Sequence, residues 1–324
     1  MSDVLKALKS AGLLSDQQLD LGFISTGSYA INKVISGSYD KGVPIGYITQ
    51  FMGESSTAKT VFVTQTLAEA QKNGYHTILI DSENAFSPSF AAVMGVDPNK
   101  LIYDSPPTLE DCFEKIEKLI MEIRELDKDT PIVVGYDSIS VSPVRAELEG
   151  DGYKQNNMLG GLRARITGDC LRRLNTIVRD QKVALMVINQ LREKVGVMYG
   201  DPSTPAAGGK SLPFYLGVEM RTSAAKSERV LDDKKRVIGI RGKIKNTKNK
   251  VSIPYRETTF ELMFDVGLNP YYGLLEALVD EDLVEQSGAW FTLVETGLKF
   301  QRKGFENLLL NDDNFENVRK MLGI

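Results

Sequence analysis

The chain has very few of the residues that build most metal sites and nucleophilic active sites. Its 324 residues contain one histidine, two cysteines and one tryptophan. His76 has no second histidine with which to form a zinc cluster, and a Ser-His-Asp triad is equally disfavoured. Cys112 and Cys170 lie in stretches with helical periodicity. We therefore expect buried free thiols, and neither a disulfide framework nor a metal site.

The chain also lacks a long hydrophobic run. No uninterrupted apolar stretch approaches the roughly 18 residues of a membrane span, and the first residues do not have the profile of a signal peptide. With 42% hydrophobic and 25% charged residues, the chain can bury a sizeable core. We expect a cytoplasmic enzyme with no membrane partner, built as one large domain with a smaller appendage.

Charge is unevenly distributed along the chain, although its net value is only −4. Residues 154–256 hold 22 Lys and Arg against 8 Asp and Glu, so this segment carries +14 and the remainder carries −18. Such an asymmetry is typical of a surface that binds phosphate backbones. A solvated charged face, or salt bridges to the acidic remainder, would give the same composition.

The first motif is a Gly-Glu-Ser-Ser-Thr-Ala-Lys-Thr segment at 53–60, which follows an apolar run and precedes a stretch with helical periodicity. A loop in this setting grips a nucleoside triphosphate: Lys59 reaches the β- and γ-phosphates, and the Thr60 hydroxyl ligates Mg²⁺. Ala58 replaces the usual glycine, so we expect a dihedral compatible with alanine and slightly less room for phosphate. The alternative is a Gly/Ser loop that only caps a helix. The predicted nucleotide-binding residues of the loop are Gly53, Glu54, Ser55, Ser56, Thr57, Ala58, Lys59 and Thr60.

Apolar runs predict a series of strands separated by amphipathic helices. The predicted strands are 47–52, 77–82, 131–138, 184–190, 216–223, 238–247 and 259–264. One helical stripe consists of Leu109, Cys112, Phe113, Ile116, Leu119 and Ile120. Alternation of the first four strands with helices favours an α/β fold with a mainly parallel sheet, and the later strands predict an antiparallel extension after residue 210.

Acidic residues follow two of the predicted strands. Because parallel strands end at the edge where ligands bind, these carboxylates are expected beside the phosphate loop. Asp137 is placed to hold the water shell of Mg²⁺. Of Asp81 and Glu83, we predict Glu83 as the base that polarises the attacking water. A carboxylate after a strand is otherwise more often a cap or turn residue.

Further segments fall into a recognisable order. They are Ile24-Ser-Thr-Gly-Ser28, the loop 53–60, Asp81-Ser-Glu-Asn-Ala85, Ala146-Glu-Leu-Glu-Gly150, Asn189-Gln190, Gly196-Val-Met-Tyr-Gly200, Lys248-Asn-Lys250 and Ser287-Gly-Ala-Trp290. Their order and spacing resemble the RecA family of homologous-recombination ATPases, over nearly the whole chain. The resemblance implies a RecA-like P-loop NTPase core at 24–266, a short N-terminal polymerisation helix or linker at 1–23, and a small C-terminal α/β domain at 267–324.

The resemblance also implies that ATP lies between adjacent protomers of a helical filament. Lys248 and Lys250 match a pair that reaches the γ-phosphate from the neighbouring protomer. On sequence alone, the run 243–250 is equally compatible with a solvated strand face or an exposed DNA contact.

Three more nucleotide contacts and a signalling residue follow from the same resemblance. Phe90 stands at the position of an adenine-stacking aromatic residue, and Tyr272 with Gly273 resembles the second adenine contact. Gln190 matches an amide that senses the γ-phosphate and passes the signal toward DNA.

Single-stranded DNA is expected to bind two loops of the basic segment, at roughly 149–161 and 191–209. Prolines and glycines argue against regular structure in the second loop. The resemblance implies phosphate contacts and apolar wedges between base triplets. The implied DNA-binding residues, with Met158 and Val195 as wedges, are Met158, Arg165, Arg172, Arg192, Lys194, Val195, Gly208 and Gly209. Periodicity alone predicts a solvated helix face for Arg163, Arg165, Arg172 and Arg173.

The chain departs from the family pattern in several places. The segment before Ile24 is short, and the first DNA loop is longer than in bacterial members. Pro213 stands where the family often has lysine. The chain stops at Ile324 without an acidic tail, and these features resemble phage recombinases more than host ones.

The function that the resemblance implies is ATP- and Mg²⁺-dependent polymerisation on single-stranded DNA, pairing with homologous double-stranded DNA, and strand exchange. Hydrolysis is expected to be stimulated by DNA. Further expected partners are single-strand-binding and loader or mediator proteins, in the cytoplasm of a cell or of an infected host, with nucleoid association. A ring-shaped helicase with the same loop, and a regulatory ATPase that only protects DNA, are the alternatives that the sequence leaves open.

Overall fold

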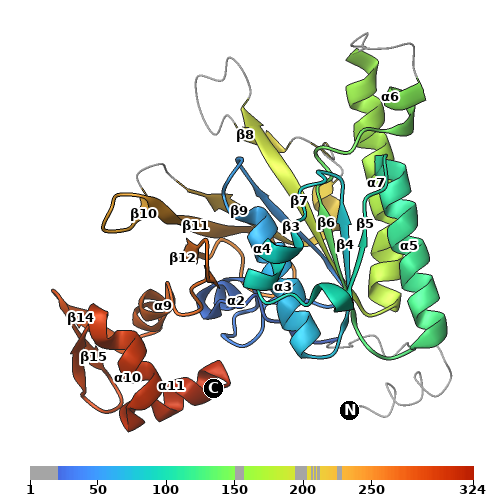
Figure 1. Ribbon diagram of the computed structural model, residues 1–324. Coiled ribbons are helices and arrows are strands. Elements are labelled where there is room, and N and C mark those ends of the chain that lie inside the picture. The colour runs from blue at the N-terminus through green and yellow to red at the C-terminus, as the bar shows by residue number, and fades with distance from the viewer. Residues whose placement is uncertain are drawn as a thin grey trace.

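A large sheet forms the centre of the computed structural model, which describes residues 21–149, 157–193, 203–205, 207, 209, 212–224 and 228–324 (Figure 1). In this described part the sheet has eleven strands, and the order of its main path is β13-β12-β11-β9-β3-β7-β6-β4-β5. Two shorter strands extend it, since β10 pairs with β11 and β8 pairs with β7. The strands of this sheet are β3 (Ile48–Gly53), β4 (His76–Asp81), β5 (Leu101–Asp104), β6 (Ile132–Asp137), β7 (Val183–Glu193), β8 (Ser203–Pro205), β9 (Leu216–Ser223), β10 (Arg229–Leu231), β11 (Val237–Asn249), β12 (Glu257–Met263) and β13 (Gly267–Leu268). A separate ribbon pairs β1 (Phe23–Ile24) with β2 (Val43–Pro44).

The sheet is parallel in its middle and antiparallel at one side, as the sequence predicts. Strands β5, β4, β6, β7, β3 and β9 run parallel to one another, whereas β11 pairs with β9 and β12, and β12 with β13, in antiparallel fashion. The register aligns Gly53 with Gln190 and Asp81 with Asp137. Four sequence-predicted residues therefore lie at one edge of the sheet.

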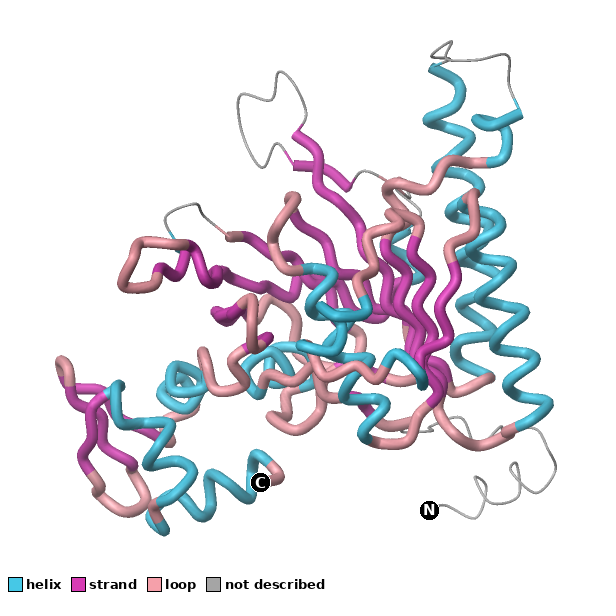
Figure 2. The backbone as a smooth tube through the Cα atoms, in the orientation of Figure 1, coloured by secondary structure: helices cyan, strands magenta, loops and turns pink. Residues whose placement is uncertain are grey.

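Helices cover both faces of this sheet (Figure 2). Those of the core are α2 (Tyr29–Ser36), α3 (Lys59–Lys72), α4 (Pro88–Val93), α5 (Leu109–Leu126), α6 (Arg145–Glu149), α7 (Asn157–Asp180) and α8 (Leu212–Tyr215). Helices α2, α3 and α4 pack on one face, and α5 and α7 pack on the other. Alternate residues of β6 serve the two layers, because Val133 joins the first core while Ile132 and Val134 join the second.

Helix α5 shows how the sequence encodes one of these layers. Thr108 caps its first turn by accepting a hydrogen bond from the N–H of Asp111, and the predicted apolar stripe faces the sheet. Cys112 of this stripe is a buried free thiol, as predicted, while Cys170 of α7 is free and only half-buried.

The C-terminal residues form a smaller unit with its own core. Its elements are α9 (Leu274–Asp280), β14 (Val284–Ser287), β15 (Trp290–Leu293), β16 (Lys299–Gln301), α10 (Phe305–Asn311) and α11 (Glu316–Leu322). Figure 1 shows this unit, in red, beside the antiparallel side of the sheet. Tyr39 from the core packs into it and donates a 2.8 Å hydrogen bond to Glu281, whose carboxylate also pairs with Lys33.

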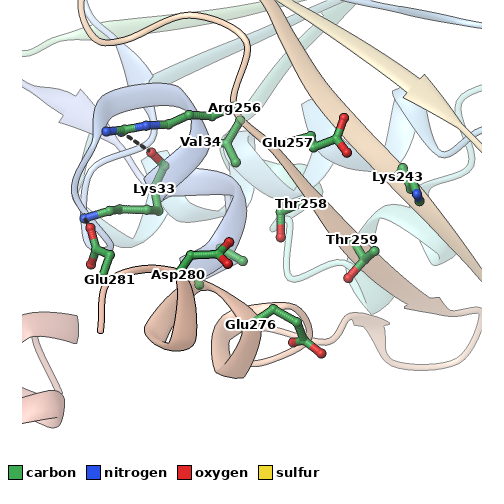
Figure 3. A pocket seen from close by; sticks show the side chains of 12 residues that line it. Lys33, Val34, Lys243, Arg256, Glu257, Thr258, Thr259, Glu276, Asp280 and Glu281 are labelled. Carbon is green, nitrogen blue, oxygen red and sulfur yellow. Dashed lines mark hydrogen bonds and ion pairs between the residues drawn. The ribbon is translucent and has the colours of Figure 1, made fainter. Parts of the chain in front are cut away.

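A cavity of about 610 Å³ lies where this unit meets the core (Figure 3). It opens between α2, the β11–β12 pair and α9. Its walls carry both cations and anions, and the close-up shows Lys33 turned to Glu281 and Arg256 to the carbonyl of Lys33. Because Lys33 and Arg256 are held by partners in the same wall, we regard the cavity as the junction of the two units and not as the site of chemistry.

Two stretches that the sequence predicts to be irregular contain regular structure. Residues 157–161 form the start of α7, because a helix of 24 residues can absorb the roughly 1 kcal/mol that each of its first two glycines costs. Pro205 is the last residue of β8 and pairs with Leu191 of β7. Because β8 lies at the margin of the sheet, a proline is tolerated there. Within the described residues, no helix combines the length and the apolar character needed to span a membrane.

Candidate nucleotide site

The loop between β3 and α3 has the tight backbone that a phosphate cradle requires. A Cβ atom on Gly53 would lie 2.2 Å from Oγ1 of Thr222, so only glycine fits there. Ser56 and Ala58 adopt left-handed backbone angles, with φ of 62° and 66°. The expected alanine-compatible dihedral is therefore wrong for Ala58: the loop enters α3 directly at Lys59, and the residue before the helix keeps the glycine-like conformation at a cost of roughly 1–2 kcal/mol.

The loop borders a cavity of about 360 Å³, and residues from several strands complete its walls. The lining residues are Ser55, Ser56, Thr57, Ala58, Lys59, Thr60, Val61, Glu83, Asp137, Ile188, Gln190, Ile240, Leu262 and Phe264. The structure thus brings most of the predicted loop together with Glu83, Asp137 and Gln190. Gly53 and Glu54 do not line the cavity. The carbonyl of Glu54 accepts from the Lys59 ammonium at 2.5 Å and from the Thr57 hydroxyl at 2.9 Å, so Glu54 holds the loop through its backbone.

Lys59 and Asp137 are the buried charged residues that line this cavity, and Thr60 lies beside Asp137. The Thr60 hydroxyl donates to Oδ2 of Asp137 at 2.5 Å. Burial raises the pKa of Asp137 to about 6, and the nearby carboxylates of Glu83 and Asp81 act in the same direction. Burial lowers the pKa of Lys59, while Asp137 and Glu83 oppose that shift. A divalent cation bound here would stabilise the ionised form of Asp137, which burial and the neighbouring carboxylates disfavour.

The two acidic candidates after β4 have different surroundings. Asp81 is buried and accepts from the N–H groups of Glu83 and Phe86 and from the Tyr103 hydroxyl, at 3.0, 2.9 and 3.2 Å. It therefore shapes the turn. Glu83 faces the cavity, and its Oε1 atom accepts from the Ser138 hydroxyl at 3.0 Å and from the Gln190 side-chain amide at 3.2 Å.

Lys248 and Lys250 lie away from this cavity, toward the opposite end of the sheet. In the register, Lys248 faces Glu219 of β9, which faces Gln50, three residues before Gly53 in β3. Both ammonium groups donate to backbone carbonyls of α8: Lys248 to Pro213, and Lys250 to Phe214 at 3.2 Å. Burial and the charge of Lys250 lower the pKa of Lys248.

The three predicted adenine contacts do not line the cavity either. Phe90 is partly exposed in α4. Tyr272 lies under the guanidinium of Arg241, 5.6 Å from the ring centre. Gly273 has φ of 82°, and a Cβ atom there would lie 2.7 Å from Oγ1 of Thr258. Their contact with a base stays a prediction.

The predicted DNA contacts fall partly outside the described residues. Lys194, Val195 and Gly208 belong to the undescribed segments, and for Met158 in α7 and Arg192 in β7 only the backbone is described. Arg165 and Arg172 are exposed on α7.

Within the described part, the contacts of the remaining α7 and loop positions are clear. Arg172 pairs with Asp169 at 2.6 Å, and Gly209 has a left-handed φ of 53°. Arg163 differs from the predicted solvated face, since it turns inward and donates to the carbonyls of Ile139, Ser140 and Ser142.

Several residues of the site carry no motif that would have revealed them. Ser138 contacts Glu83, and Thr222 of β9 forms a 2.7 Å hydrogen bond with the hydroxyl of Thr57. The apolar wall of Ile240, Leu262 and Phe264 comes from the antiparallel strands. The one available signal was the serine-rich run that follows Asp137.

The donor set fits a nucleoside triphosphate with Mg²⁺. Hydroxyl and carboxylate oxygens, here Thr60 and Asp137, are the ligands that Mg²⁺ prefers in proteins. The left-handed residues Ser56 and Ala58 lie in the loop that borders the cavity, where successive backbone N–H groups can bind phosphate oxygens. Lys59 supplies a buried cation at the same place.

Comparisons with known proteins point to a family of nucleotide-binding proteins. A family model described as the RecA N-terminal domain matches residues 8–269. The chain is 34% identical to the protein RecA of Chlorobaculum tepidum over 304 residues, which cover 92% of this chain and 83% of the relative. It is 33% identical to the protein RecA of Thermus aquaticus, with 93% and 85% covered, and to that of Herpetosiphon aurantiacus, with 95% and 82% covered.

Proposed function

The chain belongs to the RecA family of recombinases, which are DNA-dependent ATPases, and we propose that it hydrolyses ATP in the cavity at the phosphate loop while assembled as a filament on single-stranded DNA. Filaments of this kind pair their DNA with a homologous duplex and exchange strands, and we assign this activity to the chain. The observation that carries the proposal is the convergence of Lys59, Thr60, Asp137 and Glu83 on one cavity.

Each of these side chains has a distinct task. Lys59 leaves the Glu54 carbonyl to bind phosphate oxygens, and the N–H groups at the start of α3 bind beside it. Thr60 and Asp137 would hold Mg²⁺, which would supply positive charge beside the phosphates. Glu83 orients the attacking water, held in place by Ser138 and Gln190.

Lys248 and Lys250 complete the site of a neighbouring protomer. Their position toward the far end of the sheet from their own phosphate loop supports this assignment, since three residues of strand correspond to about 10 Å. Hydrolysis then depends on assembly, as it does where a second molecule supplies an arginine finger.

Base and DNA contacts follow the expectations from the sequence. Adenine stacks on Phe90 and Tyr272 beside Gly273, and the apolar wall of Leu262 and Phe264 packs against the nucleoside. Single-stranded DNA lies along the segments 149–161 and 191–209, with Met158 and Val195 as wedges. The phosphate and turn positions are Arg165, Arg172, Arg192, Lys194, Gly208 and Gly209.

The C-terminal unit collects duplex DNA on its basic residues. Lys299 and Lys303 are exposed, whereas Arg302 pairs with Glu276 and lies over the Phe291 ring. Substituting both lysines with alanine should slow duplex capture by single-stranded filaments, and Arg302→Ala should mainly lower stability. Unchanged capture by the double variant would remove this role.

Accessory partners and the place of action belong to the same proposal. Single-strand-binding and mediator proteins would assist loading, on the nucleoid or in an infected host cytoplasm. A fluorescent fusion that fails to gather at damaged DNA would contradict it.

ATP hydrolysis with and without long single-stranded DNA, with micrographs of the same samples, tests the function. We expect strong stimulation, helical filaments, and loss of turnover in Glu83→Gln. Turnover that ignores DNA, or closed rings with directional unwinding of forks, would contradict the recombinase assignment.

A further inference from the structure

A short serine-rich segment connects Glu83 to the strand β7. The chain leaves β6 as Ser138-Ile-Ser-Val-Ser142. The Ser138 hydroxyl contacts Oε1 of Glu83 at 3.0 Å and the Ser140 hydroxyl at 2.8 Å. The backbone N–H of Gln190 donates to the Ser140 hydroxyl at 3.3 Å. Ser138 and Ser140 are 0% and 2% exposed, so no bulk water competes for these contacts.

The chemistry of the groups fixes the direction of each hydrogen bond. An ionised Glu83 carboxylate only accepts, so the hydroxyl proton of Ser138 points to it. Ser140 must then donate to Ser138, and its oxygen accepts from Gln190. The chain of donors therefore runs from the backbone of Gln190 through two hydroxyls to Oε1 of Glu83. It runs parallel to the direct contact of the Gln190 side chain with the same oxygen.

Arg163 of α7 fixes this segment from the other side. Its Nη2 atom donates to the carbonyls of Ile139, Ser140 and Ser142, at 3.2, 2.7 and 2.8 Å. The two hydrogens of this Nη2 group are thus shared among three carbonyls of one turn, which would otherwise have to find other donors. The turn is joined to β7 as well, because the N–H of Ile139 donates to the carbonyl of Ile188 at 3.2 Å.

We propose that Ser140 and Arg163 are positioning residues: they hold the Glu83 carboxylate in the orientation from which it can direct the attacking water in ATP hydrolysis. This inference rests on the proposed role of Glu83. Ser140 acts through Ser138, and Arg163 acts by fixing the turn that carries both serines. Because α7 and β7 adjoin the two segments proposed to bind DNA, a displacement of either element moves the donors of Glu83 and changes the rate of hydrolysis.

Steady-state ATP hydrolysis on single-stranded DNA tests the role of Ser140. We expect Ser140→Ala to lower kcat about threefold to tenfold, the effect of one lost hydrogen bond, with KM for ATP changed less than twofold. Ser140→Thr keeps the hydroxyl and should restore most of the rate. Ser142→Ala is the matched control: it removes a buried hydroxyl of the same turn that donates to the Ser138 carbonyl and does not touch Glu83.

A double-mutant cycle tests Arg163. Arg163→Met should lower kcat to a similar extent, and Ser140→Ala should add little in that background, because both act on one carboxylate. Additive losses, an equal loss in Ser142→Ala, or a wild-type rate in Ser140→Ala would each overturn the inference. These outcomes differ from failure of the proposed function, in which the wild-type protein does not hydrolyse ATP or Glu83→Gln remains active.

Discussion

The two ends of the central strands differ in how complete they are. At the phosphate-loop end, side chains from α3, β6, β7 and the turn after β4 meet at one cavity. At the other end, Lys248 and Lys250 contact the backbone carbonyls of Pro213 and Phe214. In the proposed function, the first end holds the groups of a catalytic site at the expense of stability. The second end presents cations for the phosphate bound by a neighbouring protomer.

Backbone strain also differs between the two ends of the strands. Among the described residues, the loop contains two non-glycine residues with positive φ, Ser56 and Ala58, and the run 243–250 contains none. The raised pKa of Asp137 shows a second source of instability at the loop end, because its ionised form is disfavoured there. Strain and unfavourable ionisation of this kind persist where a ligand is to be bound. The comparison therefore predicts opposite trade-offs at the two ends.

The largest effect should come from Asp137→Asn. Folding raises the pKa of this carboxyl from its ordinary value of 3.8 to about 6. Between these two pH values the folded state therefore keeps a proton that the unfolded state has lost. Stability consequently falls as pH rises through this range, by up to about 3 kcal/mol at neutral pH. We expect Asp137→Asn to increase the free energy of unfolding without nucleotide, while kcat falls about 10³-fold through loss of Mg²⁺.

Urea denaturation at pH 5 and pH 7, with ATP turnover, measures both effects of Asp137→Asn. The gain in stability should be smaller at pH 5, where the folded carboxyl is already protonated. Asp129→Asn is the control, because Asp129 is an exposed partner of Lys182 at 3.2 Å and should change neither quantity. A destabilised Asp137→Asn protein would show that the loop end is not under electrostatic strain.

Lys248→Ala should have the next largest effect, and it tests whether the second end is half of a site. We expect kcat to fall about 10²-fold, since the neighbouring Lys250 retains part of the charge. Nucleotide binding and the free energy of unfolding should change little. Lys245→Ala, which alters an exposed residue of the same strand paired with Glu257 at 3.7 Å, should leave turnover unchanged.

Mixing two inactive variants decides whether Lys248 acts between protomers. In equal mixtures of Glu83→Gln and Lys248→Ala, sites with an intact loop from one variant and an intact lysine from the other form in about a quarter of random interfaces. We expect turnover to recover toward that fraction. Mixtures as inactive as their components would place Lys248 in the site of its own chain, or outside any site.

Sequence patterns predicted the loop end of the sheet better than its supporting contacts. The apolar runs that end near Gly53, Asp81 and Asp137 are strand signals, and parallel strands bring their ends together whatever the details of packing. Ser140 and Thr222 were not predicted, because their contacts join residues 50 and 165 positions apart in the chain, and no local period records such distances.

Residue patterns also failed to predict one side-chain direction, one short strand and one backbone conformation. The helix signal of α7 included Arg163, and only the packed turn after β6 shows that its side chain points inward. Strand β5 was not predicted, since it has four residues at the margin of the sheet. At Ala58 the residue type favoured an ordinary dihedral, and the loop imposed a left-handed one.

The smallest predicted effect, Ala58→Gly, isolates the strain of the loop end. Glycine removes a left-handed penalty of roughly 1–2 kcal/mol but adds about 0.5–1 kcal/mol of chain entropy in the unfolded state. The net gain in the free energy of unfolding should be about 0.5–1 kcal/mol, measured by urea denaturation without nucleotide. Ala70→Gly, in the buried interior of α3, should instead destabilise by about 1 kcal/mol. Ala70 is fully buried, so its loss includes the packing of one methyl group as well as helix propensity. The sign at Ala58 therefore decides the prediction, and a loss of stability in Ala58→Gly would show that Ala58 is not strained.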